Sequence, residues 1–139
     1  MSNIHVQLRR SEEFTKFLSL NDFLVEDLGA GIYRVTRDGE LPVFINVSES
    51  NIYFEVDLGN ISEIANEQFY FKLLDMNTEI LPVSFGINNT NPEDPHLVLV
   101  ETRETGDLND HELLSVFDAL ELAADKAEIL FSQYISDSK

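Results

Sequence analysis

Residues 60–87 read NISEIANEQFYFKLLDMNTEILPVSFGI, and this stretch decides how the rest of the chain is organised. Asn60 followed by Glu63 fits the asparagine version of a capping box, which marks the start of a helix. Apolar residues then recur at spacings of three and four, as one face of a helix requires: Ile61, Ile64, Ala65, Phe69, Leu73 and Met76. The stretch therefore predicts a helix, a polar turn and a strand over residues 81–87.

The predicted helix carries more apolar surface than one sheet buries. Phe71 and Leu74 widen its stripe, so that two sides of the helix are candidates for burial. Such a helix packs either against a second protein chain or against another helix of its own domain. Both alternatives stay open, and we favour another helix of the same domain.

The part of the chain before this stretch predicts a short helix and a β-meander. Ser11 caps a helix over residues 11–20, and its apolar side chains Phe14, Phe17 and Leu18 share one face. Three strands joined by short polar turns, typical of antiparallel neighbours, are expected next: residues 32–36, 42–47 and 52–58. Residues 23–28 fit either an extended lead-in or a ragged strand.

The part after this stretch predicts a hairpin strand and a long closing helix. Residues 96–102 contain the unbroken apolar run LVLV, which indicates a central strand of the sheet. The polar, proline-rich loop before it is expected to be exposed. A helix over residues 108–135 begins at a second capping box, formed by Asn109 and Glu112.

The closing helix carries an apolar seam with heptad-like spacing: Leu113, Phe117, Leu120, Ala124, Ala127, Phe131 and Tyr134. A seam of this kind packs against a second helix in a dimer or lies along a curved sheet. We favour packing on the sheet. The predicted fold is then a single α+β domain over residues 1–139: a helix, a three-stranded antiparallel meander, a helix, a two-stranded hairpin and a long C-terminal helix.

The composition restricts the function. The chain has 26 acidic residues against 9 lysines and arginines, a formal net charge of -17, which argues against nucleic acid and anionic membrane surfaces as partners. It has no cysteine, so disulfides and thiolate metal sites are excluded. No signal-peptide-like or membrane-spanning apolar run is present, so a cytoplasmic location without membrane insertion is expected.

The motifs of catalysis are missing as well. The three histidines, His5, His96 and His111, lie on different predicted elements without the spacing of metal ligands. There is no glycine-rich phosphate loop and no nucleophile elbow. We expect neither a metal nor a cofactor, and we do not expect an enzyme.

Two blocks resemble the YjfI-like family of small bacterial proteins: LLDMNTEILPVSFGI at residues 73–87 and the helix HELLSVFDALELAADKAEIL at residues 111–130. The segment GELPVFINVSESNIYFEVDL at residues 39–58 is similar to that family's strand pattern. The loop NNTNPEDPH departs from it. The order of the elements is also similar to that of CesT-type type III secretion chaperones.

These resemblances imply a homodimer that holds a partly unfolded client segment across its sheet and helix surfaces. YjfI-like proteins are often encoded near PspA-type membrane-stress proteins, so the resemblance implies such a protein, or a secreted client, as the partner. Family likeness of this kind speaks to the fold more than to the function.

The leading functional hypothesis is a non-enzymatic protein-binding module, chaperone-like or regulatory, that acts as a homodimer. It would receive a helix or a strand of its partner on apolar surface. The candidate contact residues, most of which equally fit a hydrophobic core, are Phe14, Phe17, Phe69, Leu73, Phe117 and Phe131. The alternatives are a secretion chaperone dedicated to one effector, and a small-molecule sensor with a pocket between the sheet and the terminal helix.

Overall fold

The computed structural model describes the backbone of residues 11–104 and 109–137 and the side chains of residues 15–104 and 109–134. The elements are, in chain order, α1 (Ser11–Leu20), β1 (Leu24–Gly29), β2 (Ile32–Thr36), β3 (Val43–Val47), β4 (Asn51–Asn60), α2 (Glu67–Asn77), β5 (Ser84–Asn88), β6 (His96–Glu104) and α3 (Asp110–Asp137). The strands form one antiparallel sheet in the order β1-β2-β3-β4-β6-β5. The predicted α+β class is confirmed.

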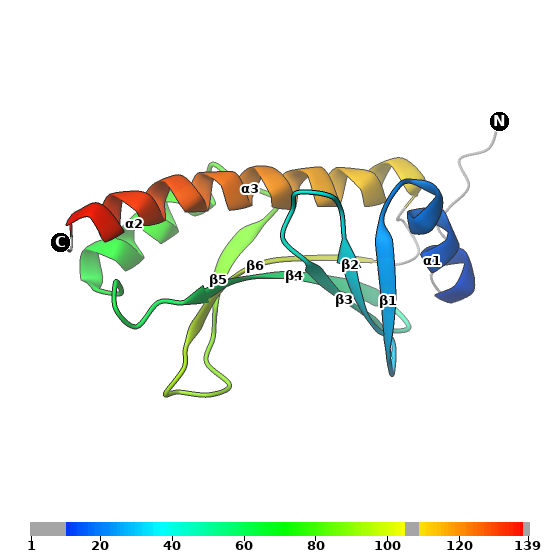
Figure 1. The fold of residues 1–139 in the computed structure, drawn as a ribbon, viewed down its shortest axis with the longest axis horizontal. Helices are drawn as coiled ribbons and strands as arrows, with labels where there is room; N and C mark the ends of the chain where they lie inside the picture. The colour runs from blue at the N-terminus through cyan, green and yellow to red at the C-terminus, as the bar shows by residue number, and fades with distance from the viewer. Residues whose placement is uncertain (1–10, 105–108, 138–139) are drawn as a thin grey trace.

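The three helices are arranged around one face of this sheet. α3 runs along the face, with α1 beside β1 at one end and α2 near the C-terminal part of α3 at the other (Figure 1). Along β4 the side chains alternate, as the period of two in a strand requires: Phe54 and Val56 are buried, whereas Tyr53 and Asp57 are exposed. Phe54 meets Phe117 of α3 edge to face, with 5.9 Å between ring centroids. The buried face is therefore the one that α3 covers.

The ambiguous segment after α1 is a strand. β1 pairs with β2, with Leu24 opposite Thr36, so the meander has four strands where three were firmly expected. Its pattern gave little signal because almost all of its side chains are exposed on this edge strand. The prediction that residues 96–102 lie centrally is confirmed, because β6 pairs with both β4 and β5.

The helix predicted from residue 60 begins later, at Glu67. Asn60 belongs to the end of β4, where it pairs with His96, and its side chain accepts a hydrogen bond from Ser62 N at 2.8 Å. The cap is Asn66, whose side chain accepts from Phe69 N at 2.8 Å. Pairing with β6 extends β4 through the first asparagine, and so the second one caps the helix.

β5 also starts later than expected, at Ser84. The preceding residues form a turn, in which Val83 N donates to Ile80 O at 3.0 Å, and the Leu81–Pro82 bond is cis. The strand then runs in regular register along β6 to Asn88.

The seam of the closing helix packs on the sheet, as favoured from the sequence. Leu113, Phe117 and Leu120 are fully or almost fully buried in a larger core beneath the first half of α3. The smaller core lies at the α2 end: Ile61, Phe69, Leu73, Leu97 and Leu130. The predicted cap is also confirmed, since the Asn109 side chain accepts from Glu112 N at 2.9 Å.

Within the described ranges, no helix is both long enough and apolar enough to cross a membrane.

Candidate protein-binding surfaces

Three of the six side chains predicted to contact a partner lie in the core. Phe69, Leu73 and Phe117 have exposed fractions of only 0%, 4% and 1%. They therefore have the core role that was the alternative for them. The side chain of Phe14 lies outside the described residues. Partner binding through this set stays a prediction.

The two remaining side chains are half-buried at the margins of the cores. Phe131 stacks on Phe69, with 6.1 Å between ring centroids and 27° between the ring planes. It joins Phe69 and Leu73 at the smaller core, whereas Phe17 and Phe117 belong to the larger one. The five candidates whose side chains are described thus divide between the two ends of the sheet and do not form one surface.

The exposed apolar side chains at the α2 end come from different positions. Tyr70, Phe71 and Leu74 of α2 are 42%, 70% and 69% exposed, and Ile87 of β5 is 45% exposed. We call these four residues the α2–β5 surface. The sequence signal was present, because Phe71 and Leu74 widened the helix stripe beyond one face. The centre of the stripe is buried, and its flank faces solvent.

A pocket of about 260 Å³ opens within this surface. Its lining is almost entirely apolar and comes from α2, β5 and β6: Tyr70, Leu73, Leu74, Asn77, Phe85, Gly86, Ile87 and Leu97. We call it the α2–β5 pocket. A pocket of this kind is suited to one bulky apolar side chain of a partner.

The backbone of β5 is partly covered by α2. Asn77, the last residue of α2, accepts a hydrogen bond from Phe85 N through its side-chain oxygen at 2.7 Å. This N–H group points away from β6 and is no longer available to a further strand. An edge strand covered in this way resists pairing with another chain.

The opposite edge of the sheet is β1, and it also presents apolar side chains. Leu24 and Leu28 are 71% and 48% exposed, and Leu20, at the end of α1, is 75% exposed. We call these three residues the β1 edge surface. Besides the ladder to β2, Glu26 of β1 forms an ion pair with Arg34 of β2 at 3.7 Å, and Gly29 N donates to the Asp27 side chain at 2.8 Å.

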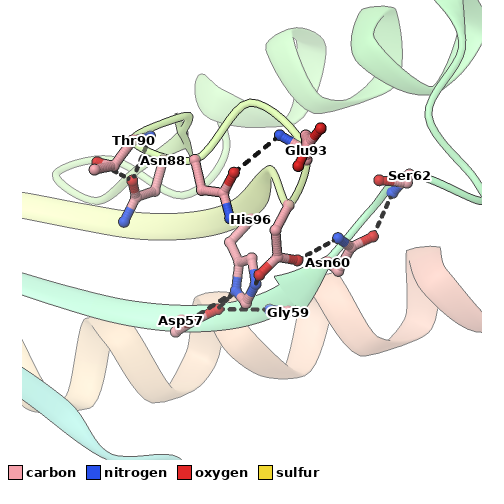
Figure 2. Close-up of polar contacts among 10 residues, drawn as sticks. Asp57, Gly59, Asn60, Ser62, Asn88, Thr90, Glu93 and His96 are labelled. Carbon is pink, nitrogen blue, oxygen red and sulfur yellow. Dashed lines mark hydrogen bonds and ion pairs between the residues drawn. The ribbon is translucent and has the colours of Figure 1, made fainter.

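Polar side chains form a compact cluster where β4 ends and β6 begins (Figure 2). The His96 ring lies between two carboxylates: Nδ1 is 2.9 Å and 3.0 Å from the two oxygens of Asp57, and Nε2 is 3.1 Å from Asp94. Asn60 donates to Asp94 at 2.5 Å. We call the contacts of His96 with Asp57 and Asp94 the His96 clasp. It joins β4 to the loop before β6.

The clasp changes the proton affinities of its members. The hydrogen bond to Asp57 raises the pKa of His96, and the bond to Asp94 adds to this effect. The pKa of Asp94 is lowered, first by the hydrogen bond from Asn60 and then by that from His96. The arrangement therefore favours a protonated imidazole between two ionised carboxylates.

An arginine fastens the first half of α3 to the meander. Arg37, which follows β2, donates from Nε to Glu121 at 2.8 Å and from Nη2 to Asp118 at 3.1 Å. Its guanidinium also lies over the Phe23 ring, 4.7 Å from the centroid. Burial, the largest single effect, lowers the pKa of Arg37. The hydrogen bonds and charges of Glu121 and Asp118 together outweigh it, so the pKa is raised.

A second set of charges lies under the start of α3. Glu101 of β6 is buried, and its Oε2 accepts from Arg103 Nε at 2.5 Å. Arg103 also reaches Glu112 of α3, at 3.5 Å. The other oxygen of Glu101 has no hydrogen-bond partner among the described residues. No group of three or more histidines and acids in the described residues is arranged to hold a metal ion.

A second cavity, of about 560 Å³, lies between the end of β4, the turn before α2 and the C-terminal part of α3. Leu58 of β4 and Phe131 of α3 line it, together with the polar residues Asn60, Ser62 and Glu63. It is a mixed polar and apolar site.

Comparison with known proteins agrees with this fold. The CesT_Tir_1 family model, which describes type III secretion chaperones, matches residues 7–135, and the chain belongs to this family. It is a chaperone-like, protein-binding family. The family match supports the CesT-type resemblance of the sequence, whereas the YjfI-like resemblance is not confirmed.

Three solved structures are similar. A chain of the heterodimeric ExoU-SpcU complex from the type III secretion system of Pseudomonas aeruginosa is 17% identical (TM-score 0.67, 83% of this chain and 94% of that chain). YbjN from E. coli, a putative transcription regulator, is 13% identical (TM-score 0.66, 92% and 94%). The Yersinia pestis type III secretion chaperone SycH, in complex with a stable fragment of YscM2, is 21% identical (TM-score 0.59, 88% and 98%). At these identities the likeness shows the fold alone.

No curated protein sequence matches the chain significantly.

Proposed function

We propose that the chain is a chaperone-like module that works as a homodimer and holds an extended, apolar segment of a partner protein. The observation that carries the proposal is the pair of uncovered apolar surfaces at the two ends of one sheet, the α2–β5 surface and the β1 edge surface. The α2–β5 surface contains a pocket, whereas the β1 edge surface lies on an edge strand, and we therefore expect different occupants for the two.

A second copy of the chain is the proposed occupant of the α2–β5 surface. A two-fold dimer brings the same surface of both copies together. Each α2–β5 pocket then receives an apolar side chain of the other copy, and burial of Phe71 and Leu74 supplies association energy. Because each copy carries a net charge of -17, we expect salt to strengthen the association by screening the repulsion.

An extended segment of the client is the proposed occupant of the β1 edge surface. An edge strand presents a row of backbone groups to which another strand can pair. Backbone hydrogen bonds of this kind accept many sequences, whereas exposed Leu24 and Leu28 favour apolar side chains in the added strand. A chaperone needs this combination, since it binds a segment before that segment has folded.

A secreted client is the favoured partner. Membership of a type III secretion chaperone family supports it. Two of the similar structures are complexes with a second protein, ExoU-SpcU and SycH with a fragment of YscM2. A PspA-type membrane-stress protein is the other proposed partner, and it depends on the unconfirmed YjfI-like resemblance. Deleting the gene for the chain should reduce the level or the export of one protein; unchanged secretion contradicts a dedicated secretion chaperone.

The homodimer is tested by sedimentation of the double variant Phe71→Ser with Leu74→Ser. We expect the unaltered chain to be dimeric and the variant to be monomeric with the same circular dichroism spectrum. The matched control is Leu122→Ser with Ile129→Ser, which removes two side chains of α3 that are 61% and 63% exposed. A monomeric unaltered chain contradicts the homodimer.

Client binding is tested by capture of the tagged chain from its own lysate at low and moderate salt. We expect one stoichiometric client, which is lost with Leu24→Lys because a lysine on an edge strand opposes strand pairing. The Leu122→Ser variant should retain it. If the client is absent, or if Leu24→Lys retains it in full, the proposed role of the β1 edge is wrong.

A small-molecule sensor is the second candidate. The cavity of about 560 Å³ favours it, because its walls include Leu58 of the sheet and Phe131 of the terminal helix, where such a pocket was expected. A thermal-shift screen that yields a ligand, whose effect is lost in Leu58→Trp, would support the sensor. A screen without any ligand would count against it.

A further inference from the structure

We propose that the His96 clasp is a pH-dependent latch, which holds the loop before β6 on the end of β4 while the imidazole is protonated and releases the loop when the imidazole is neutral. The latch itself goes beyond the proposed function and does not depend on it.

The positions of the two ring nitrogens carry the proposal. Nδ1 faces Asp57 and Nε2 faces Asp94, both at hydrogen-bonding distance. Only an imidazolium donates from both nitrogens, because a neutral ring always keeps a lone pair on one of them. In the neutral ring, that lone pair faces a carboxylate oxygen, and one of the two contacts turns from attractive to repulsive.

Among the described residues, the other donors to the clasp carboxylates are neutral: Gly59 N donates to Asp57 at 2.8 Å, and Asn60 donates to Asp94. Asp57 comes from β4 and Asp94 from the loop, and these are the charged groups that act on His96. The neighbouring side chains on the paired strands, Asn60 of β4 and Asn88 of β5, are neutral. Among the ion pairs of the described residues, neither carboxylate has a lysine or arginine partner. Loss of the proton therefore leaves two carboxylates without a cation.

The latch holds the loop against the segment that leads into α2. Asp94 receives the hydrogen bond from Asn60, and Ile61 N donates to Pro95 O at 3.3 Å. Ile61 is 2% exposed and belongs to the smaller core. Release of the loop thus frees one anchor of the turn between β4 and α2.

The latch also adjoins the α2–β5 pocket. Leu97, which follows His96 in β6, and Ile87, which pairs with Leu97 in β5, both line the pocket. We therefore expect association through the α2–β5 surface to weaken as the latch opens. This consequence, unlike the latch, rests on the proposed homodimer.

The direction of the pH effect follows from the raised pKa of His96. A group whose pKa is higher in the closed state stabilises that state at pH values below its ordinary pKa of about 6.5. The stabilisation is lost as the pH rises through the raised pKa. By linkage, the equilibrium constant for opening the loop is larger at high pH than at low pH. The factor of increase equals the acid dissociation constant of His96 in the open state divided by that in the closed state.

The first experiment follows the His96 ring by NMR titration in the full chain. We expect a pKa above the ordinary histidine value, and we expect Asp57→Asn and Asp94→Asn each to lower it, with the double variant lowest. Asp38→Asn is the matched control, because it removes one negative charge from an exposed turn. If the pKa is not raised, or if Asp38→Asn lowers it as much as Asp57→Asn does, the latch is excluded.

The second experiment measures amide hydrogen exchange of Asn91, Glu93 and Asp94, the loop residues in this stretch that carry an N–H, across the same pH range and after division by the intrinsic exchange rates. We expect protection to fall with rising pH by the factor that the titration defines. The variant His96→Gln should show no such step. A loop whose protection in the unaltered chain has no step overturns the proposal, whether or not the chain dimerises.

Sedimentation at pH values on either side of the measured pKa then tests the consequence for the homodimer. Weaker association above the pKa in the unaltered chain, absent in His96→Gln, supports the coupling. A dimer without pH dependence removes the coupling, and a chain that is monomeric at every pH contradicts the proposed homodimer while the two latch measurements still stand.

Discussion

The two edges of the sheet, β1 and β5, both expose large apolar side chains, but they differ in the state of their backbones. At β5 the side chain of Asn77 takes the outward N–H of Phe85, and the exposed side chains of α2 stand over a pocket. At β1 the exposed leucines accompany an edge strand at the end of the sheet. Exposed apolar area alone therefore does not define a partner. The accessibility of the edge backbone separates a surface for side-chain docking from one for strand addition.

The two ends differ in their cores as well, and the largest predicted effect tests this difference. Phe117→Ala removes a ring that contacts Phe23 and Phe54 in the larger core. We expect it to lower the free energy of unfolding by about 3–5 kcal/mol, as measured by denaturant unfolding. Phe69→Ala in the smaller core should cost a similar amount and loosen α2 selectively in hydrogen exchange.

If Phe69→Ala instead lowers the protection of backbone amides from exchange equally at both ends of the sheet, the two cores do not behave as separable regions. The control is Phe71→Ala, which removes an exposed ring of the same helix. We expect this change to alter the free energy of unfolding by no more than about 0.5 kcal/mol.

A smaller effect is expected where β6 passes beneath the start of α3. Arg103→Met leaves the buried carboxylate of Glu101 without its hydrogen-bond donor. We expect a loss of about 2 kcal/mol, since a buried charged group then lacks a partner. Glu101→Gln combined with Arg103→Met should recover most of this loss in a double-mutant cycle. Additive losses would show that the pair is not coupled.

The smallest of these effects makes β5 more like β1. Asn77→Ala exposes the Phe85 N–H at the edge and removes one hydrogen bond, so we expect a loss of about 1 kcal/mol. The freed edge should also promote self-association through strands, visible as larger species in sedimentation and as thioflavin fluorescence. Asn89→Ala, in the exposed loop, is the control. An Asn77→Ala variant with unchanged association would mean that covering this N–H does not protect the edge.

Most of the fold was predictable because its signals are local. The seam of α3 and its Asn109 cap, the alternation of β4 and the apolar run of β6 each require only a few neighbouring residues to be recognised. β1 was ambiguous because an edge strand with exposed side chains lacks an apolar alternation. The start of α2 was missed for a different reason. Asn60 and Asn66 both fit a helix cap, and only pairing with β6 assigns the first one to a strand.

The candidate surfaces were less predictable than the fold. The sequence indicated surplus apolar residues on α2, yet the chosen positions Phe69 and Leu73 are buried, whereas the flanking Phe71 and Leu74 are exposed. An amphipathic pattern gives the direction of the apolar stripe, and in α2 the centre of that stripe is the buried part. The part that remains exposed depends on how much of the helix the sheet and α3 cover.

The sequence by itself determined the α+β class, the succession of amphipathic elements and the acidic charge, because these follow from composition and from spacings of two or of three and four residues. Only the tertiary structure decided which asparagine caps α2, which edge backbone is covered, and that His96 meets Asp57, 39 residues away. Such contacts depend on strand register and on the packing of helices over the sheet. These are long-range pairings that no local pattern specifies.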